Sequence, residues 1–151
     1  MTRLATIMLL VSVSTVAAQQ SPFAGAWQMS YVAGMRIENG VGTPVQATGV
    51  LTIEVRGDSL IGNLVTDPAP DRPIRPPLRM AAKAEGATPV FVSEGQATVR
   101  RNGTQLEVTV VSTWKLAVTG DSLVGTVERR LEGIEVPDQG AQPVKGKRRE
   151  G

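Results

Sequence analysis

The sequence predicts an all-β protein: a single antiparallel up-and-down barrel of about eight strands, with a two-sheet β-sandwich as the alternative. Three observations lead to this prediction. A hairpin pattern occurs twice, 63 residues apart, at residues 53–62 and 116–125. The 16 glycines and 10 prolines indicate many turns, and no long helical pattern interrupts them. Only 3% of the residues are aromatic, so β-branched and other aliphatic side chains must fill the interior.

Both copies of the pattern contain Gly-Asp-Ser-Leu. The Gly-Asp pair predicts a two-residue hairpin turn, because glycine readily supplies the positive φ that such turns need. With these turns, the cross-strand pairs are Val55 with Leu60, Ile53 with Gly62 and Leu51 with Leu64 in the first hairpin, and Val118 with Leu123, Leu116 with Gly125 and Trp114 with Val127 in the second. All these positions share one face, which favours a common interior and closure into a barrel.

A third hairpin is predicted at Asn102-Gly103, the strongest two-residue turn pair. Apolar side chains then keep one parity through residues 104–119, which predicts one long strand shared by two hairpins. This hairpin pairs Val99 with Leu106 and Ala97 with Val108. The predicted strands are 25–32, 48–56, 59–66, 78–85, 90–101, 104–119, 122–132 and a final segment at 143–149.

Two segments do not fit strands. Residues 67–77 contain five prolines and predict an extended, polyproline-like crossover. Their Pro-x-x-Pro spacing also occurs in docking peptides, but this composition is commoner in linkers. Residues 134–142 predict a polar loop.

The first residues carry the pattern of a secretory signal peptide. Arg3 supplies a positive charge, residues 4–13 form a short apolar run, and small residues precede a cleavage site after Ala18. The run is too short to cross a bilayer of about 30 Å, and no later segment is apolar enough. We therefore expect residues 1–18 to be removed and residues 19–151 to form one domain, periplasmic or extracellular. No cysteine follows the cleavage region, which excludes a lipoprotein anchor.

Composition excludes several chemistries. The sequence contains neither cysteine nor histidine, so it offers no disulfide, no thiolate or imidazole zinc site and no Ser-His-Asp relay. Asp58 and Asp121 repeat with Ser59 and Ser122, but aspartate suits such turns through its backbone hydrogen bonds, and the serines have no base. We therefore expect no enzymatic activity, no cofactor and no bound metal. The net charge is +2, and four cations lie within 145–149. The rest of the domain is therefore close to neutral, which argues against a nucleic-acid-binding face.

Phe23-Ala-Gly25-Ala-Trp27 opens the first predicted strand. With the hairpin repeats, it resembles the lipocalin-like (calycin-type) small β-barrels, and more closely a loosely defined group of exported bacterial proteins that mostly lack an assigned activity. The resemblance covers residues 22–149 and implies an up-and-down barrel. It also implies that Arg148 or Arg149 packs across Trp27 at the barrel base, a contact that contributes about 1 kcal/mol. The alternative is that residues 143–151 form a loose basic tail.

Arg129 is the exception among the strand cations, because its parity with Leu123, Val127 and Leu131 points it inward. A buried charge is costly unless it is paired, so we expect either a carboxylate partner such as Glu38 or an anionic ligand head group. The residues expected around an interior pocket are Trp27, Met29, Tyr31, Met80, Trp114, Leu116 and Arg129.

Two functions fit this domain. One is a binding module that holds a small apolar or amphipathic molecule in the barrel. The other is a structural or protein-interaction domain whose interior is filled by its own side chains. A continuous interior void of about 300 Å³ or more favours the first function, and a packed interior favours the second. A membrane-spanning barrel is not expected, because aromatic girdles are missing and charges interrupt the apolar face.

Overall fold

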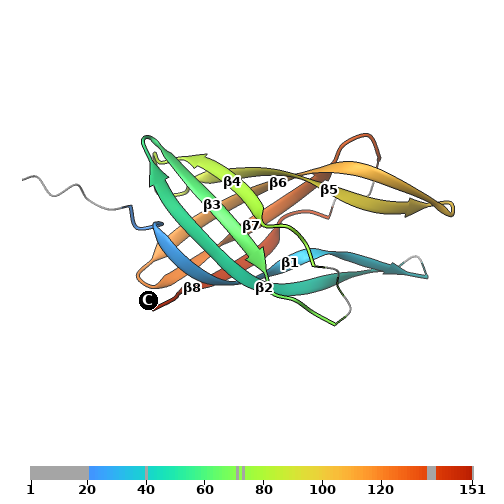
Figure 1. The fold of residues 1–151 in the computed structure, drawn as a ribbon, viewed down its shortest axis with the longest axis horizontal. Helices are drawn as coiled ribbons and strands as arrows, with labels where there is room; N and C mark the ends of the chain where they lie inside the picture. The colour runs from blue at the N-terminus through green and yellow to red at the C-terminus, as the bar shows by residue number, and fades with distance from the viewer. Residues whose placement is uncertain (1–20, 40, 71, 73, 136–138, 151) are drawn as a thin grey trace, which may run out of the picture.

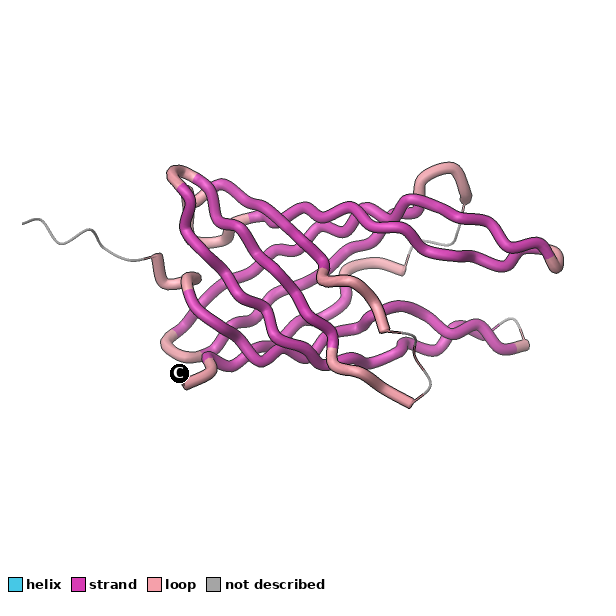
Figure 2. Tube along the Cα trace, viewed as in Figure 1, coloured by secondary structure: helices cyan, strands magenta, loops and turns pink. Residues whose placement is uncertain are grey.

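The computed structural model describes residues 21–150 except 40, 71, 73 and 136–138, so the predicted signal peptide lies outside the described part. The described residues contain no helix. They form eight antiparallel strands in sequence order, and β1 pairs with β8 to close a barrel (Figures 1 and 2). The strands are β1 (Gly25–Glu38), β2 (Val41–Arg56), β3 (Ser59–Thr66), β4 (Leu78–Lys83), β5 (Val90–Arg101), β6 (Thr104–Thr119), β7 (Ser122–Leu131) and β8 (Gln142–Arg148). The predicted barrel is confirmed, and the alternative sandwich is wrong.

The three predicted hairpin turns are confirmed. Gly57 and Gly120 have φ of +61° and +60°, and two-residue loops join β2 to β3 and β6 to β7. Asn102 and Gly103 have φ of +51° and +78°, as a type I′ turn requires. Every predicted cross-strand pair is present. The long strand β6 pairs with β5 over residues 104–115 and with β7 over residues 110–119, so two hairpins share it.

The first hairpin is longer than the sequence indicated. β1 and β2 remain paired as far as Glu38 and Val41, whereas the alternation predicted strands only at 25–32 and 48–56. Asn39 at the tip has φ of +51° and is followed by glycine, the same pair of residues that forms the β5–β6 turn. A β-bulge between Val32 and Gly34 shifts the register. Because of this shift, a strict two-residue alternation of apolar side chains does not detect the outer part of the hairpin.

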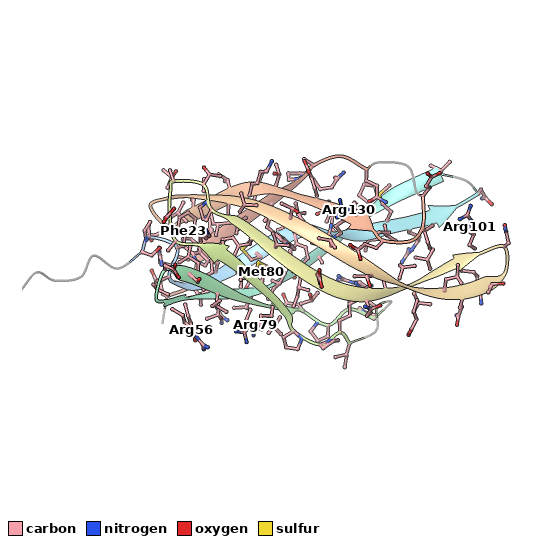
Figure 3. All side chains as sticks on the ribbon, turned by 90° about the horizontal axis from the view of Figure 1, so that it is seen from above. Phe23, Arg56, Arg79, Met80, Arg101 and Arg130 are labelled. Atoms are coloured by element: carbon pink, nitrogen blue, oxygen red, sulfur yellow. The ribbon has the colours of Figure 1, made fainter. Side chains whose placement is uncertain are left out.

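The barrel has two different ends (Figure 1). One end, called the closed end below, carries the β2–β3, β4–β5 and β6–β7 turns and residues 21–24. At the other end, called the mouth, the β1–β2 and β5–β6 hairpins extend beyond the remaining strands, and the described parts of segments 67–77 and 132–141 lie at this end as well. Figure 3 shows the distance between the ends: Phe23 lies at the closed end and Arg101 lies at the tip of the β5–β6 hairpin.

The proline-rich crossover at the mouth is less extended than its composition predicts. The Arg72 backbone N–H donates to the Ala69 carbonyl oxygen at 3.1 Å, and the two residues form a short bridge. This contact marks a turn in the middle of the segment.

The hydrophobic core fills the closed half of the barrel and reaches as far as Trp114. Its largest fully buried side chains are Trp27, Trp114, Phe91, Met29, Leu51, Ile53, Leu60, Met80, Leu116, Leu123, Val127 and Val144. Inward glycines make this packing possible, since a Cβ on Gly62 would lie 2.7 Å from Met80 Cγ and one on Gly146 would lie 2.6 Å from Met29 Sδ. The closed half is therefore filled by its own side chains.

Two residues of the predicted cross-strand pairs keep the inward parity but are exposed. Val55 is 45% exposed because it lies next to the β2–β3 turn, and Leu106 is 39% exposed because it lies in the part of the β5–β6 hairpin that extends past the barrel. The expectation that Val55 points into the common interior is wrong for that reason. Parity assigns a face of the sheet, but burial also requires a side chain on the opposite wall.

Candidate functional site at the mouth of the barrel

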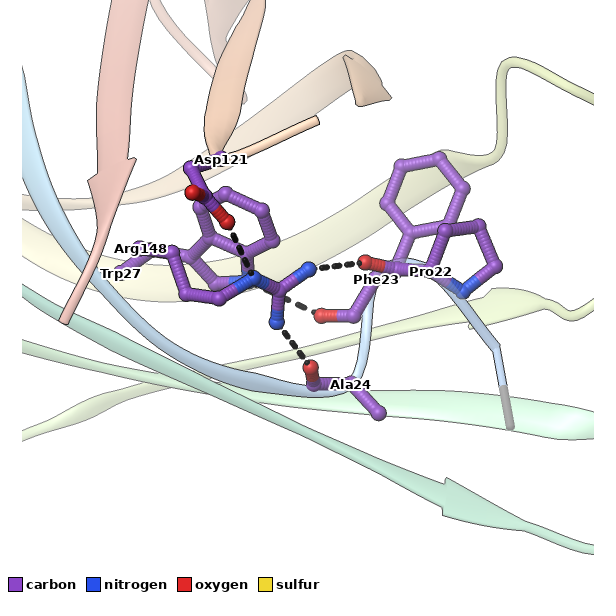
Figure 4. A network of polar contacts seen from close by, with 6 residues as sticks. All are labelled: Pro22, Phe23, Ala24, Trp27, Asp121 and Arg148. Carbon is purple, nitrogen blue, oxygen red and sulfur yellow. Dashed lines mark hydrogen bonds and ion pairs between the residues drawn. The ribbon is translucent and has the colours of Figure 1, made fainter. Parts of the chain in front are cut away.

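Arg148 closes the base of the barrel (Figure 4). Its guanidinium carbon lies 4.2 Å from the centroid of the Trp27 ring, and its nitrogens donate to the carbonyl oxygens of Ala24 and Pro22, each at 2.8 Å. Asp121 in the β6–β7 turn forms an ion pair with Arg148 at 3.5 Å. The contact expected for Arg148 is present, and β8 is a paired strand rather than a loose tail. All of these contacts are internal, so they give this end a structural role.

Four of the seven predicted pocket residues belong to the packed closed half. Trp27, Met29, Met80 and Leu116 are at most 1% exposed and are members of the core cluster. Tyr31 and Trp114 are members of the same cluster, at 3% and 1% exposed, so Arg129 is the one predicted pocket residue that lies outside the packed core.

The other three, Tyr31, Trp114 and Arg129, lie together toward the mouth and are called the mouth cluster below. The Tyr31 and Trp114 rings meet edge to face, with their centroids 5.7 Å apart and their planes at 69°. Arg129 Cζ lies 5.6 Å from the centroid of the Trp114 ring. The Tyr31 hydroxyl shares a 2.7 Å hydrogen bond with the Thr66 hydroxyl, and Trp114 Nε1 donates to Ser93 Oγ at 3.4 Å.

Small residues beside Arg129 give its long side chain room inside the barrel. The strand register places Arg129 opposite Ser112 and Ser112 opposite Ser93, and both serines are buried. Ala47, which is opposite Tyr31, is buried as well. The sheet therefore surrounds the guanidinium with short and partly polar side chains, whereas long aliphatic ones fill the closed half.

Arg129 carries its charge without a carboxylate partner among the residues that the structure describes. Burial lowers the pKa of Arg129, and the charge of Arg75 lowers it further, while Tyr31 opposes both effects. The side chain of Glu38 lies outside the described part of the chain, so its expected pairing with Arg129 stays a prediction. The described contacts of the Arg129 guanidinium are therefore aromatic and leave its N–H groups available to a ligand.

Burial raises the pKa of Tyr31 above its ordinary value of about 10, although its hydrogen bond to Thr66 and two nearby arginines oppose the rise. The hydroxyl is therefore neutral at physiological pH and can donate or accept a hydrogen bond. Asp67 also contributes to the rise, and its carboxylate accepts a hydrogen bond from the Thr48 hydroxyl at 2.7 Å.

The proline-rich segment brings two further cations to the mouth cluster. The charge of Arg72 acts on Tyr31, and the charge of Arg75 acts on Arg129. Arg72 Nη1 is buried and has no hydrogen-bond partner among the described residues. A buried N–H group of this kind costs free energy until an acceptor reaches it.

Apolar side chains continue from the mouth cluster toward solvent. These inward-facing residues are partly exposed: Ala33, Val45, Leu78, Ala97, Val110 and Leu131. Gly95 lies among them, and a Cβ added there would meet only Leu78 Cδ1, at an ordinary contact distance of 3.8 Å. The mouth half therefore has room for additional atoms, unlike the closed half.

Sequence reasoning missed several of these residues. Ser93 and Ser112 follow the inward parity, but a serine in a strand gives no signal of what lies opposite it. Arg72 and Arg75 belong to a segment that the proline content marks as a linker. Inward parity combined with a polar residue type is the signal that found Arg129, and it would also have found the two serines.

A separate shallow groove of about 380 Å³ crosses the outer wall over β1, β7 and β8. Exposed side chains such as Ser30, Val124 and Lys145 form part of its lining. This groove lies outside the barrel, so it is not the interior void that distinguishes a binding barrel from a filled one.

The described residues contain no group of three or more acidic, histidine or cysteine side chains that could hold a metal ion. Within the same residues, no helix is long and apolar enough to cross a membrane. No protein-family model matches the chain, and no curated protein and no solved structure matches it either. The function must therefore be inferred from the chemistry of the site itself.

Proposed function

We propose that this protein is an exported, lipocalin-like binding module that holds a small apolar or amphipathic molecule at the mouth of its barrel. The signal-peptide pattern of residues 1–18 supports export. The Gly25-Ala-Trp27 start and the hairpin repeats support the resemblance to lipocalin-like barrels. The binding proposal depends on one observation: the two halves of the barrel interior are built differently.

The two halves differ in the space beside their inward glycines. In the closed half, Met80 and Met29 occupy the positions that side chains on Gly62 and Gly146 would need. In the mouth half, Gly95 has open space before it reaches Leu78. The closed half thus provides a rigid base, and the mouth half provides the room that a bound molecule requires.

The polar residues of the mouth half support binding over a purely structural role. Filling this region with leucine or isoleucine would stabilise the fold by about 1.5–3 kcal/mol for each fully buried side chain. The barrel instead places Ser93, Ser112 and a half-buried Arg129 there, and the charge of Arg129, which has no described carboxylate partner, costs free energy when it is taken out of water. A ligand whose polar group contacts these residues accounts for them.

We do not propose catalysis. The Ser59 hydroxyl of the repeated motif donates to its neighbour Asp58 at 3.3 Å in an exposed turn, far from the mouth. Burial raises the pKa of Tyr31, so its hydroxyl stays protonated at neutral pH and is not available as a base. The site therefore offers recognition groups rather than an acid and base matched to neutral pH.

The alternative is a structural or protein-interaction barrel without a ligand, and the complete packing of the closed half favours it. Native mass spectrometry of the protein purified from its own periplasm or culture medium separates the two. We expect a co-purifying small molecule that is lost on denaturation. A ligand-free spectrum, together with no binding of added amphiphiles, would establish the structural alternative.

A further inference from the structure

We propose that the molecule held at the mouth is an amphiphile with an anionic head, a carboxylate or a phosphate monoester, whose head contacts Arg129, Arg72 and the Tyr31 hydroxyl. This inference depends on the proposed function and specifies the ligand class for the same site. The shared chemistry of the two head groups is a compact anion with several acceptor oxygens, which matches a guanidinium fork.

Charge supports an anion rather than a neutral polar head. The charges of Arg129 and Arg72 act on the Tyr31 hydroxyl, and the charge of Arg75 acts on Arg129. The described carboxylate that acts on the same hydroxyl, Asp67, already accepts a hydrogen bond from Thr48. The mouth cluster therefore has an excess of positive charge, and a bound anion would compensate it.

Unsatisfied hydrogen-bond donors support the same conclusion independently of charge. Arg72 Nη1 is buried without an acceptor among the described residues, and the Arg129 guanidinium has only the Trp114 ring as a described contact. The base of the barrel provides the comparison, because Arg148 also lies over a tryptophan but donates to two backbone carbonyl oxygens. The arginine at the base is saturated by the protein, and the two at the mouth are not.

The apolar surroundings support a hydrocarbon tail. The partly exposed residues that continue from the mouth cluster toward solvent are aliphatic, and Val110 and Leu131 are paired directly beside the Ser112–Arg129 pair. A free inorganic anion would leave this surface without a partner, whereas an alkyl chain would cover it.

The test compares three probes with the same chain length, octanoate, octyl phosphate and uncharged 1-octanol, by isothermal titration calorimetry. The two anions are used below their micelle concentrations and 1-octanol is used below its solubility limit. We expect both anions to bind at least about tenfold more tightly than 1-octanol, since a charged hydrogen-bonded pair contributes that much. The more tightly bound anion identifies the natural head group. Arg129→Gln should reduce anion affinity to the level of 1-octanol.

Arg130→Gln is the matched control, because this neighbouring arginine has a side chain that is 77% exposed and points away from the barrel. It should bind the anions as the wild type does, and Arg129→Lys should retain part of the preference for anions. Thermal melting of each variant confirms that it is folded. Equal affinity for 1-octanol and the anions, or equal losses in Arg129→Gln and Arg130→Gln, would overturn the anionic head group and leave the binding module intact. If none of the three probes binds, both proposals fail.

A second readout locates the anion. Tyr31 is the sole tyrosine of the chain, so the near-ultraviolet absorbance of phenolate reports its ionisation alone. A bound anion beside the hydroxyl should raise the pKa of Tyr31 further. An unchanged Tyr31 titration at saturating octanoate would place the anion elsewhere and contradict the inference.

Discussion

Replacing Arg148 with methionine tests how the base of the barrel is held closed. The variant Arg148→Met keeps an unbranched apolar side chain over Trp27 and removes only the guanidinium. It deletes two hydrogen bonds to the carbonyl oxygens of Ala24 and Pro22 and a cation–π contact at 4.2 Å. The ion pair with Asp121 is also lost, but that carboxylate is 89% exposed.

The magnitude follows from these contacts. Each hydrogen bond contributes about 1 kcal/mol, because the Arg148 side chain is 32% exposed and water partly replaces the lost donor. The cation–π contact contributes about 1 kcal/mol and the exposed ion pair at most about 0.5 kcal/mol. Methionine recovers about 1 kcal/mol through contact with the Trp27 ring. We therefore expect a net loss of about 2 kcal/mol in the free energy of unfolding, or roughly 8 °C in melting temperature.

Guanidinium chloride denaturation, followed by tryptophan fluorescence, measures this loss. Asp121→Asn is the control, because it removes the carboxylate and leaves the hydrogen bonds and the ring contact in place. It should change the free energy of unfolding by less than about 0.5 kcal/mol. If Arg148→Met unfolds at the wild-type midpoint, or if Asp121→Asn destabilises the protein equally, the two carbonyl contacts do not hold the base closed.

Three further predictions concern the contrast between the two ends. Arg129→Met should raise the free energy of unfolding by about 1 kcal/mol, because it removes a half-buried cation without a described carboxylate partner. A loss comparable to that of Arg148→Met would show that the guanidinium is satisfied after all. Gly62→Ala should destabilise the fold by about 1–3 kcal/mol, because the added methyl group overpacks against Met80. Gly95→Ala should change the free energy of unfolding by less than about 0.5 kcal/mol. Equal denaturation midpoints for the two variants would contradict the difference in packing. The phenolate absorbance of the folded protein should titrate above pH 10, because burial raises the pKa of Tyr31. The free energy of unfolding should be unaffected by Tyr31 below about pH 10 and should decline as the pH rises through the raised pKa. A titration at the ordinary value would show that Tyr31 is solvated.

The hairpin turns explain why so much of this barrel can be predicted from its sequence. A two-residue loop fixes both the register of its strands and the face of every side chain, so Gly57, Gly120 and Asn102 together determine most of the pairing. The closing contact of Arg148 was expected only from the resemblance to lipocalin-like barrels, which left Arg148 and Arg149 as alternatives, and the structure shows that Arg148 makes it.

The contents of the mouth could not be predicted in the same way. The β-bulge after Val32 concealed the outer part of the first hairpin, although Asn39 and the following glycine repeat the turn signal of the β5–β6 hairpin. Parity located Arg129 inside the barrel, but only the folded chain brings Arg72 from a proline-rich connection to the same place. Contacts between a loop and a distant strand depend on how the whole barrel closes, and no local pattern records them.

The most direct test of the binding site is the pair of indole N–H signals in a two-dimensional nitrogen–proton NMR spectrum. The chain has two tryptophans, one at each end: Trp27 donates to the Phe23 carbonyl oxygen at the closed end, and Trp114 donates to Ser93 beneath the mouth cluster. On titration with octanoate, we predict that the Trp114 signal moves in a saturable manner while the Trp27 signal stays fixed. A saturable shift confined to Trp27, or no shift of either signal, would contradict a ligand site at the mouth of the barrel.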